Sequence, residues 1–168
     1  MLIGNGGAGK STLARELGHR TGLYVVHLDA LFWQPGWVEP AREEWRVTQR
    51  EALDGTDWIA DGNYSGTMEE RLPAADVVVL LDYPRRVCLL GVVTRAWRYR
   101  HTPRPDMAPC CPERLDFSFL RYVWSYPDEG RPRVLAKVER YGKNDVLVRL
   151  RNRREARAWL DTMDPAGS

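Results

Sequence analysis

Short apolar, β-branched runs alternate with longer helical patterns along this chain. That alternation predicts βαβ units and a parallel sheet, and therefore an α/β fold. The run 77–81 is apolar throughout, which is typical of a strand buried on both faces. We expect strands over residues 1–3, 24–28, 58–60, 77–81 and 146–150. We expect helices over residues 11–20, 40–53 (with Pro40 in the first helical position), 84–100, 115–124, 132–141 and 153–163.

The chain has 168 residues and no internal repeat, so we expect one domain over 1–168. Residues 101–112 hold four prolines and are expected to be largely irregular. No apolar run approaches the roughly 20 residues of a membrane helix, so no membrane partner is expected. The chain opens on a motif instead of a signal peptide and has three cysteines, which favours a cytoplasmic location.

A phosphate-binding loop with the spacing G-x-x-x-x-G-K-S begins three residues into the chain. Glycines let successive backbone N–H groups point at phosphate oxygens, and the following helix adds its positive end. In such loops the lysine reaches the β- and γ-phosphates and the serine hydroxyl binds Mg²⁺. The sequence therefore predicts an ATP and Mg²⁺ site formed by Gly4, Asn5, Gly6, Gly7, Ala8, Gly9, Lys10, Ser11 and Thr12.

Three aspartates each follow a predicted strand directly: Asp29, Asp61 and Asp82. Ligands in open α/β sheets bind outside the carboxyl ends of the strands. We therefore expect these carboxylates near the phosphate loop, although aspartate also favours strand exits and turns for its own reasons. Asp61 is the strongest candidate for ligand contact and Asp82 the weakest.

Charge is distributed unevenly, although the formal net charge is only +2. Residues 83–105 contain six arginines, one histidine and no acid, which suits the reception of phosphates. A second basic cluster near the C-terminus is either a solvated face or a DNA contact. It consists of Arg149, Arg151, Arg153, Arg154 and Arg157.

Several motifs together make this chain resemble a family over nearly its whole length. They are His27-Leu28-Asp29-Ala30-Leu31-Phe32-Trp33, Pro35-Gly36-Trp37, Asp61-Gly62-Asn63-Tyr64-Ser65-Gly66-Thr67 and Arg104-Pro105-Asp106-Met107. These segments are similar to those of the adenylate-kinase-like proteins known as DNA topology modulation proteins, the FlaR-related group. The wider resemblance is to nucleoside monophosphate kinases. It implies a three-layer P-loop NTPase fold with strand order 2-3-1-4-5, a substrate-binding insertion at about 30–56 and an arginine-bearing lid at about 98–128.

The same resemblance implies roles for individual residues. Asp61-Gly62 matches the Asp-Gly of adenylate kinases, in which the aspartate helps to hold Mg²⁺ through water. The Phe-Pro-Arg that follows there is Asn63-Tyr64-Ser65 here, so the arginine for the acceptor phosphate is missing and Arg71 is our candidate substitute. Arg95 matches an arginine that reaches ATP, and Arg98 is a further lid candidate.

Two kinds of function remain open from the sequence. The first is an ATP-dependent phosphotransferase with a nucleotide, nucleoside or other small acceptor, in which Lys10, Arg95, Asp61 and Asp29 are the catalytic candidates. Asp29, Trp33 and Tyr64 are expected at the acceptor, where Asp29 is placed to orient a hydroxyl or accept its proton. Core packing is the alternative for Trp33, since large aromatic side chains often fill cores. The alternative is a nucleotide-responsive DNA-binding protein, and a slow ATPase switch is a third interpretation. Either a monomer or a dimer is compatible with these predictions.

Overall fold

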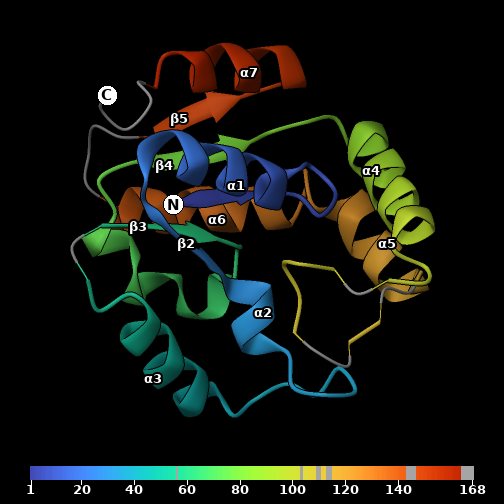
Figure 1. The fold of residues 1–168 in the computed structure, drawn as a ribbon, viewed down its shortest axis with the longest axis horizontal. Coiled ribbons are helices and arrows are strands. Elements are labelled where there is room, and N and C mark those ends of the chain that lie inside the picture. Colours follow the sequence, from blue (N-terminus) through green and yellow to red (C-terminus); the bar gives the residue numbers. More distant parts are fainter. Residues whose placement is uncertain (56, 103, 109–110, 113–114, 143–146, 164–168) are drawn as a thin grey trace.

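A five-stranded parallel sheet forms the centre of the molecule, in the order β2-β3-β1-β4-β5 (Figure 1). The computed structural model describes residues 1–55, 57–102, 104–108, 111–112, 115–142 and 147–163. The strands are β1 (Leu2–Gly4), β2 (Tyr24–His27), β3 (Trp58–Asp61), β4 (Val78–Leu81) and β5 (Leu147–Leu150). The predicted α/β class, the parallel sheet and the strand order are confirmed.

Helices cover both faces of this sheet, with α1 in front and α6 behind in Figure 1. On one face, Leu13 and Leu17 of α1 pack against Leu2 and Leu81. On the other face, Val134 of α6 packs in a second buried cluster with β1 and β4 residues. The α-helices are α1 (Lys10–Thr21), α2 (Leu28–Phe32), α3 (Arg42–Ala52), α4 (Arg85–Arg98), α5 (Phe117–Ser125), α6 (Gly130–Tyr141) and α7 (Arg153–Asp161). Two 3₁₀ helices, η1 (Ser65–Glu70) and η2 (Leu72–Ala74), join β3 to β4.

Several predicted element ends are wrong, and local backbone geometry explains them. Pro40 does not begin α3, because Ala41 is extended (φ −60°, ψ 146°) and the helix starts at Arg42. Leu28 belongs to α2 instead of β2, so Asp29 lies in the first turn of a five-residue helix. Asp61 is the last residue of β3 instead of the residue after it. The two 3₁₀ helices were not predicted at all.

Some predictions concern residues outside the described part of the chain. These are residue 146, the predicted start of the fifth strand, and residues 103, 109–110 and 113–114 of the predicted lid. The described residues between 101 and 112 form no helix or strand, as the prolines predicted. Within the described ranges, no helix is long and apolar enough to cross a membrane.

Candidate functional site

The phosphate loop joins β1 to α1 and is held in a tight curve. Gly4 ends β1 and Lys10 begins α1, so the loop is bounded by a buried strand and a helix N-terminus. The Lys10 ammonium donates to the carbonyl oxygens of Gly4 at 3.2 Å and Asn5 at 3.0 Å. Ser11 and Thr12 follow in the first turn of α1. The loop therefore places a cation, two hydroxyls and a helix N-terminus at the carboxyl end of the sheet, which is the arrangement that binds phosphates.

Helix α4 supports this loop through two glycines in direct contact. Gly7 has φ 76°, a conformation that favours glycine, and a Cβ atom there would lie 2.1 Å from the Cys88 carbonyl oxygen. A Cβ atom on Gly91 of α4 would lie 2.2 Å from the Gly7 carbonyl oxygen. No side chain separates the loop from α4 at this point, so the position of the loop depends on the helix.

Asn63 pairs with both backbone polar groups of Gly4, which sequence reasoning had missed. Its Oδ1 accepts from the Gly4 N–H at 2.9 Å, and its Nδ2 donates to the Gly4 carbonyl at 2.8 Å. The same Nδ2 lies 3.4 Å from the hydroxyl of Tyr122 on α5. Asn63 therefore joins the end of β3 to the start of the phosphate loop. The sequence contained one signal for this role, the replacement of an expected phenylalanine by an amide directly after Asp61-Gly62.

Two of the three strand-end aspartates are brought together near Lys10. The Asp61 carboxylate is 5% exposed, and its Oδ2 lies 3.0 Å from His27 Nδ1. Asp61 Oδ1 is buried without a hydrogen-bond partner among the described residues. Burial raises the pKa of Asp29, the Tyr64 hydrogen bond to its carboxylate (2.7 Å) opposes the rise, and the charges of Asp61 and Lys10 act on it in opposite directions. Asp61, Lys10 and Tyr64 therefore all lie close enough to Asp29 to affect its pKa.

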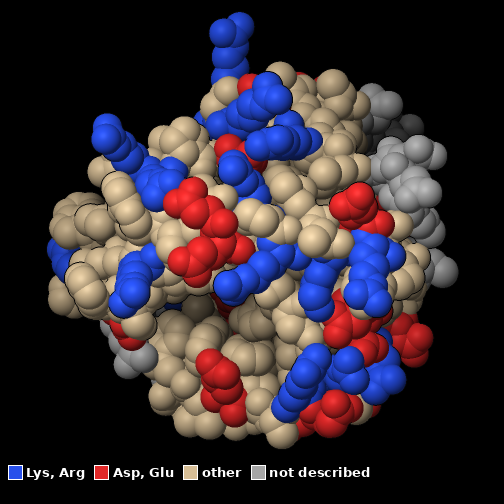
Figure 2. Space-filling view, turned by 180° about the vertical axis from the view of Figure 1, so that it is seen from behind, with Lys and Arg blue, Asp and Glu red and all other residues tan. Residues whose placement is uncertain are grey.

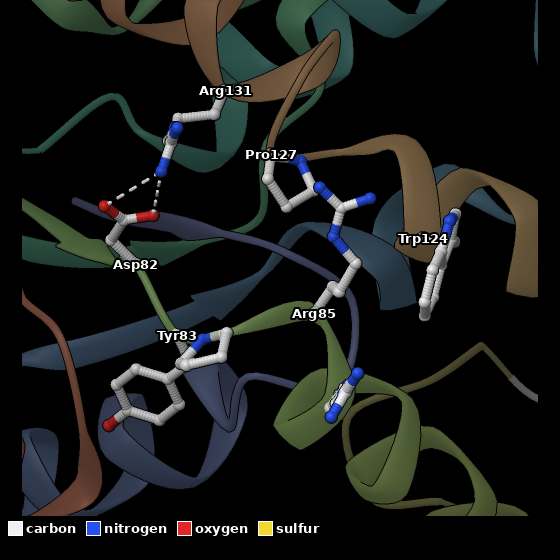
Figure 3. A pocket seen from close by; sticks show the side chains of 8 residues that line it. Asp82, Tyr83, Arg85, Trp124, Pro127 and Arg131 are labelled. Carbon is white, nitrogen blue, oxygen red and sulfur yellow. Dashed lines mark hydrogen bonds and ion pairs between the residues drawn. The ribbon is translucent and has the colours of Figure 1, made fainter.

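Asp82 has a different environment from Asp29 and Asp61. Its carboxylate accepts from Arg131 of α6 at 3.1 Å and from Nε of Arg149 of β5 at 2.6 Å, and these ion pairs join the two elements. Asp82 lines a hollow of about 520 Å³ at the end of β4 (Figure 3). The other residues lining it are Tyr83, Pro84, Arg85, Arg86, Trp124, Pro127 and Arg131. No phosphate-loop residue lines this hollow.

Arg71, our candidate for the acceptor phosphate, lies inside the protein. The residue is 1% exposed, and burial lowers the pKa of its guanidinium to about 10. It donates to Gln49 Oε1 at 2.5 Å and to the Gly62 carbonyl at 3.3 Å, and also to the Asn63 carbonyl. These bonds fix the turn after β3, so this arrangement does not support a role for Arg71 as a phosphate ligand.

The predicted lid contacts both the predicted insertion and the phosphate loop. Arg104, with a side chain 4% exposed, donates to Asp106 at 2.5 Å. Burial raises the pKa of Asp106, but hydrogen bonds from Arg104 and Ser11 outweigh it and lower the pKa. Asp106 thereby connects the lid to the phosphate loop. Trp33 of the insertion is half-buried against the cluster of Met107, Ala108 and Cys111, so its packing contribution is evident while acceptor contact stays a prediction.

The remaining arginine candidates lie at the end of α4. Arg95 is half-buried, and its guanidinium carbon is 5.7 Å from the centre of the Phe119 ring of α5. Arg98 is exposed in the last turn of the same helix. Their contact with ATP stays a prediction. On the face seen in Figure 2, basic and acidic side chains are interspersed, and no continuous basic surface crosses that view.

The phosphate loop and Asp61 present the kinds of group that Mg²⁺ and phosphates prefer. The Ser11 hydroxyl and the unpartnered Oδ1 of Asp61 are oxygen atoms of the kind that Mg²⁺ prefers, and Lys10 with the loop amides would suit phosphate oxygens. In the described part of the chain, no group of three or more His, Cys, Asp or Glu side chains is placed to hold a metal ion. Comparison with protein-family models and with curated proteins finds no match for this chain.

Proposed function

We propose that this protein is a Mg²⁺- and ATP-dependent phosphotransferase that acts on a small-molecule acceptor. The observation that carries the proposal is the Lys10 ammonium held over the Gly4 and Asn5 carbonyls, at 3.2 and 3.0 Å, at the start of a helix that follows the central strand. A lysine so placed is available to phosphate oxygens, because a negatively charged phosphate oxygen attracts the ammonium more strongly than a neutral carbonyl oxygen does.

Each residue has a distinct part in this function. Lys10 and the loop amides would bind the β- and γ-phosphates, and Ser11 with Asp61 would hold the metal. Bound Mg²⁺ would neutralise charge on the phosphates and fix their orientation. Arg95 and Arg98 would stabilise the charge of the transferring group from α4, since a planar guanidinium holds phosphate oxygens bidentately. His27 would keep Asp61 oriented through its 3.0 Å contact.

Equilibrium binding and turnover test this proposal separately. A fluorescent ATP analogue with Mg²⁺ should bind the unaltered protein, and Lys10→Ala should weaken it by about 100-fold. Lys137→Ala is a matched control, because Lys137 pairs with Glu69 at 2.6 Å and away from the loop. Binding that is indifferent to Lys10→Ala would refute the site. Bound ATP without acceptor-dependent ADP release, across a panel of nucleotides, nucleosides and polyols, would refute the phosphotransferase activity and leave nucleotide binding intact.

A further inference from the structure

Asp29 and Tyr64 form a hydrogen-bonded carboxylate and phenol beside the phosphate loop. The Tyr64 hydroxyl donates to Asp29 Oδ1 at 2.7 Å. Tyr64 adopts φ 35° and ψ 56°, a left-handed conformation that residues other than glycine rarely take. Strained backbone of this kind persists where the surrounding structure holds it, and it is concentrated at functional sites. The surrounding structure therefore holds the Asp29–Tyr64 pair in a fixed position beside the phosphate loop.

The arginine expected to serve an acceptor phosphate is committed to the backbone instead. Arg71 donates to the Gly62 and Asn63 carbonyls and to the Gln49 side chain, and it is 1% exposed. Withdrawing the guanidinium would leave buried carbonyls without a donor, which is unfavourable. Arg71 consequently fixes the turn that carries Tyr64, and its guanidinium is not accessible to an acceptor phosphate.

The charges around Asp29 also disfavour an anionic acceptor. Among the neighbouring charges, the Asp61 carboxylate has the largest effect on the pKa of Asp29 and raises it, whereas Lys10, the cation assigned above to the ATP phosphates, lowers it. Arg104 lies near enough to lower that pKa, but its guanidinium is bound to Asp106 at 2.5 Å. A phosphate dianion next to Asp29 would face two carboxylates, whereas a neutral hydroxyl would find a hydrogen-bond acceptor.

Resting on the phosphotransferase activity proposed above, we propose that the acceptor is a neutral hydroxyl compound, such as a sugar, polyol or nucleoside, and that Asp29 takes the hydroxyl proton. The acceptor oxygen forms a bond to the γ-phosphorus of ATP. The bond from that phosphorus to the β,γ-bridging oxygen breaks, and ADP leaves with the electron pair. The proton passes from the hydroxyl to the Asp29 carboxylate and then to water. Burial favours this transfer, because a carboxylate with a raised pKa is a stronger base.

The chemical nature of the product tests the acceptor class. The full-length protein is incubated with Mg·ATP and either a mixture of nucleosides, pentoses, hexoses and polyols or a mixture of nucleoside monophosphates, and the product is identified by ³¹P NMR. We expect a phosphomonoester in the first mixture. A phosphoanhydride in the second mixture, with none of the monoester, would overturn the inference while supporting the phosphotransferase. Absence of transfer in both mixtures with ATP bound would overturn both proposals.

The role of Asp29 can be tested without knowing the acceptor. Slow ATP hydrolysis is the measurement, because water can take the place of the acceptor hydroxyl in that reaction. Asp29→Asn should lower hydrolysis and transfer to hydroxyl compounds by about 100-fold or more. The affinity for Mg·ATPγS should stay within about threefold of the unaltered value, because Asp29 contacts the acceptor and not the donor. Asp54→Asn, at an exposed position, is the matched control. Undiminished hydrolysis and transfer in a folded Asp29→Asn protein would overturn the role of Asp29.

Discussion

Replacing Asn63 with alanine should damage both stability and nucleotide binding. The substitution leaves the buried Gly4 N–H without the acceptor that lay at 2.9 Å, which costs about 1–3 kcal/mol. The Gly4 carbonyl loses its 2.8 Å bond to Asn63 but keeps Lys10 at 3.2 Å. We therefore expect a loss of about 2 kcal/mol in the free energy of unfolding without nucleotide. At a urea m-value of about 2 kcal/mol per molar, the unfolding midpoint falls by about 1 M.

Nucleotide should make the same substitution more costly. If Lys10 leaves the Gly4 carbonyl for the phosphates, Asn63 is the remaining donor to that carbonyl in the unaltered protein. The variant then loses about another 1 kcal/mol in the bound state, which weakens the affinity for Mg·ATP by about fivefold. Urea unfolding followed by tryptophan fluorescence, with and without Mg·ATPγS, measures both effects. Thr48→Ala is the control, because its hydroxyl makes a single exposed bond to a backbone carbonyl at 3.0 Å. If Asn63→Ala lowers the free energy of unfolding without nucleotide by less than about 0.5 kcal/mol, this reasoning is refuted.

Three further predictions concern stability. Gly7→Ala should lower the thermal midpoint by roughly 6–12 °C, because a Cβ atom would lie 2.1 Å from the Cys88 carbonyl oxygen. The corresponding loss in the free energy of unfolding is about 3 kcal/mol. A calorimetric midpoint within about 2 °C of the original would contradict this. Asp29→Asn should raise the midpoint at pH 7.5, because a carboxylate whose pKa is raised by folding destabilises the charged native state, and the gain should vanish below about pH 4. Burial pushes the pKa of Glu69 upward, but the Lys137 hydrogen bond and other contacts outweigh it and lower the pKa to about 2. Its stabilising effect is thus present above about pH 4.5 and is lost as the pH falls toward 2. In Glu69→Gln, the fall in the free energy of unfolding between about pH 4.5 and pH 2 should be smaller by about 1–2 kcal/mol than in the unaltered protein. The same fall in both proteins, measured by urea unfolding at each pH, would contradict this role of Glu69.

The phosphate loop and the sheet were predictable because their signals are local. The spacing of the residues from Gly4 to Ser11 predicts the loop and the helix that follows it, and an apolar run such as 77–81 predicts a buried strand. The role of Arg71 was not predictable, and that of Asn63 had only the amide after Asp61-Gly62 as a signal, because both roles depend on which backbone groups the fold brings within reach. An arginine ten residues after Asp61 is equally compatible in sequence with a phosphate ligand and with a buried brace. Contacts alone distinguish the two.

Element ends were the least predictable part of the fold for a related reason. The apolar pattern that suggested strand through residue 28 continues into α2, since a buried Leu28 satisfies either element. The helix expected from residue 40 starts later because Ala41 is extended, a backbone choice that tertiary packing decides.

Gly91 shows how a residue's effect on an isolated helix and on the folded protein can have opposite signs. In a peptide containing α4 (Arg85–Arg98), Gly91→Ala should increase helicity, because alanine is favoured over glycine by about 1 kcal/mol in a helix interior. In the intact protein the same methyl group would lie 2.2 Å from the Gly7 carbonyl oxygen. A substitution that raises the helix propensity of α4 at this position would therefore disturb the contact between α4 and the phosphate loop. A stability-guided redesign that scores helices one at a time would therefore favour a substitution in α4 that pushes against the phosphate loop.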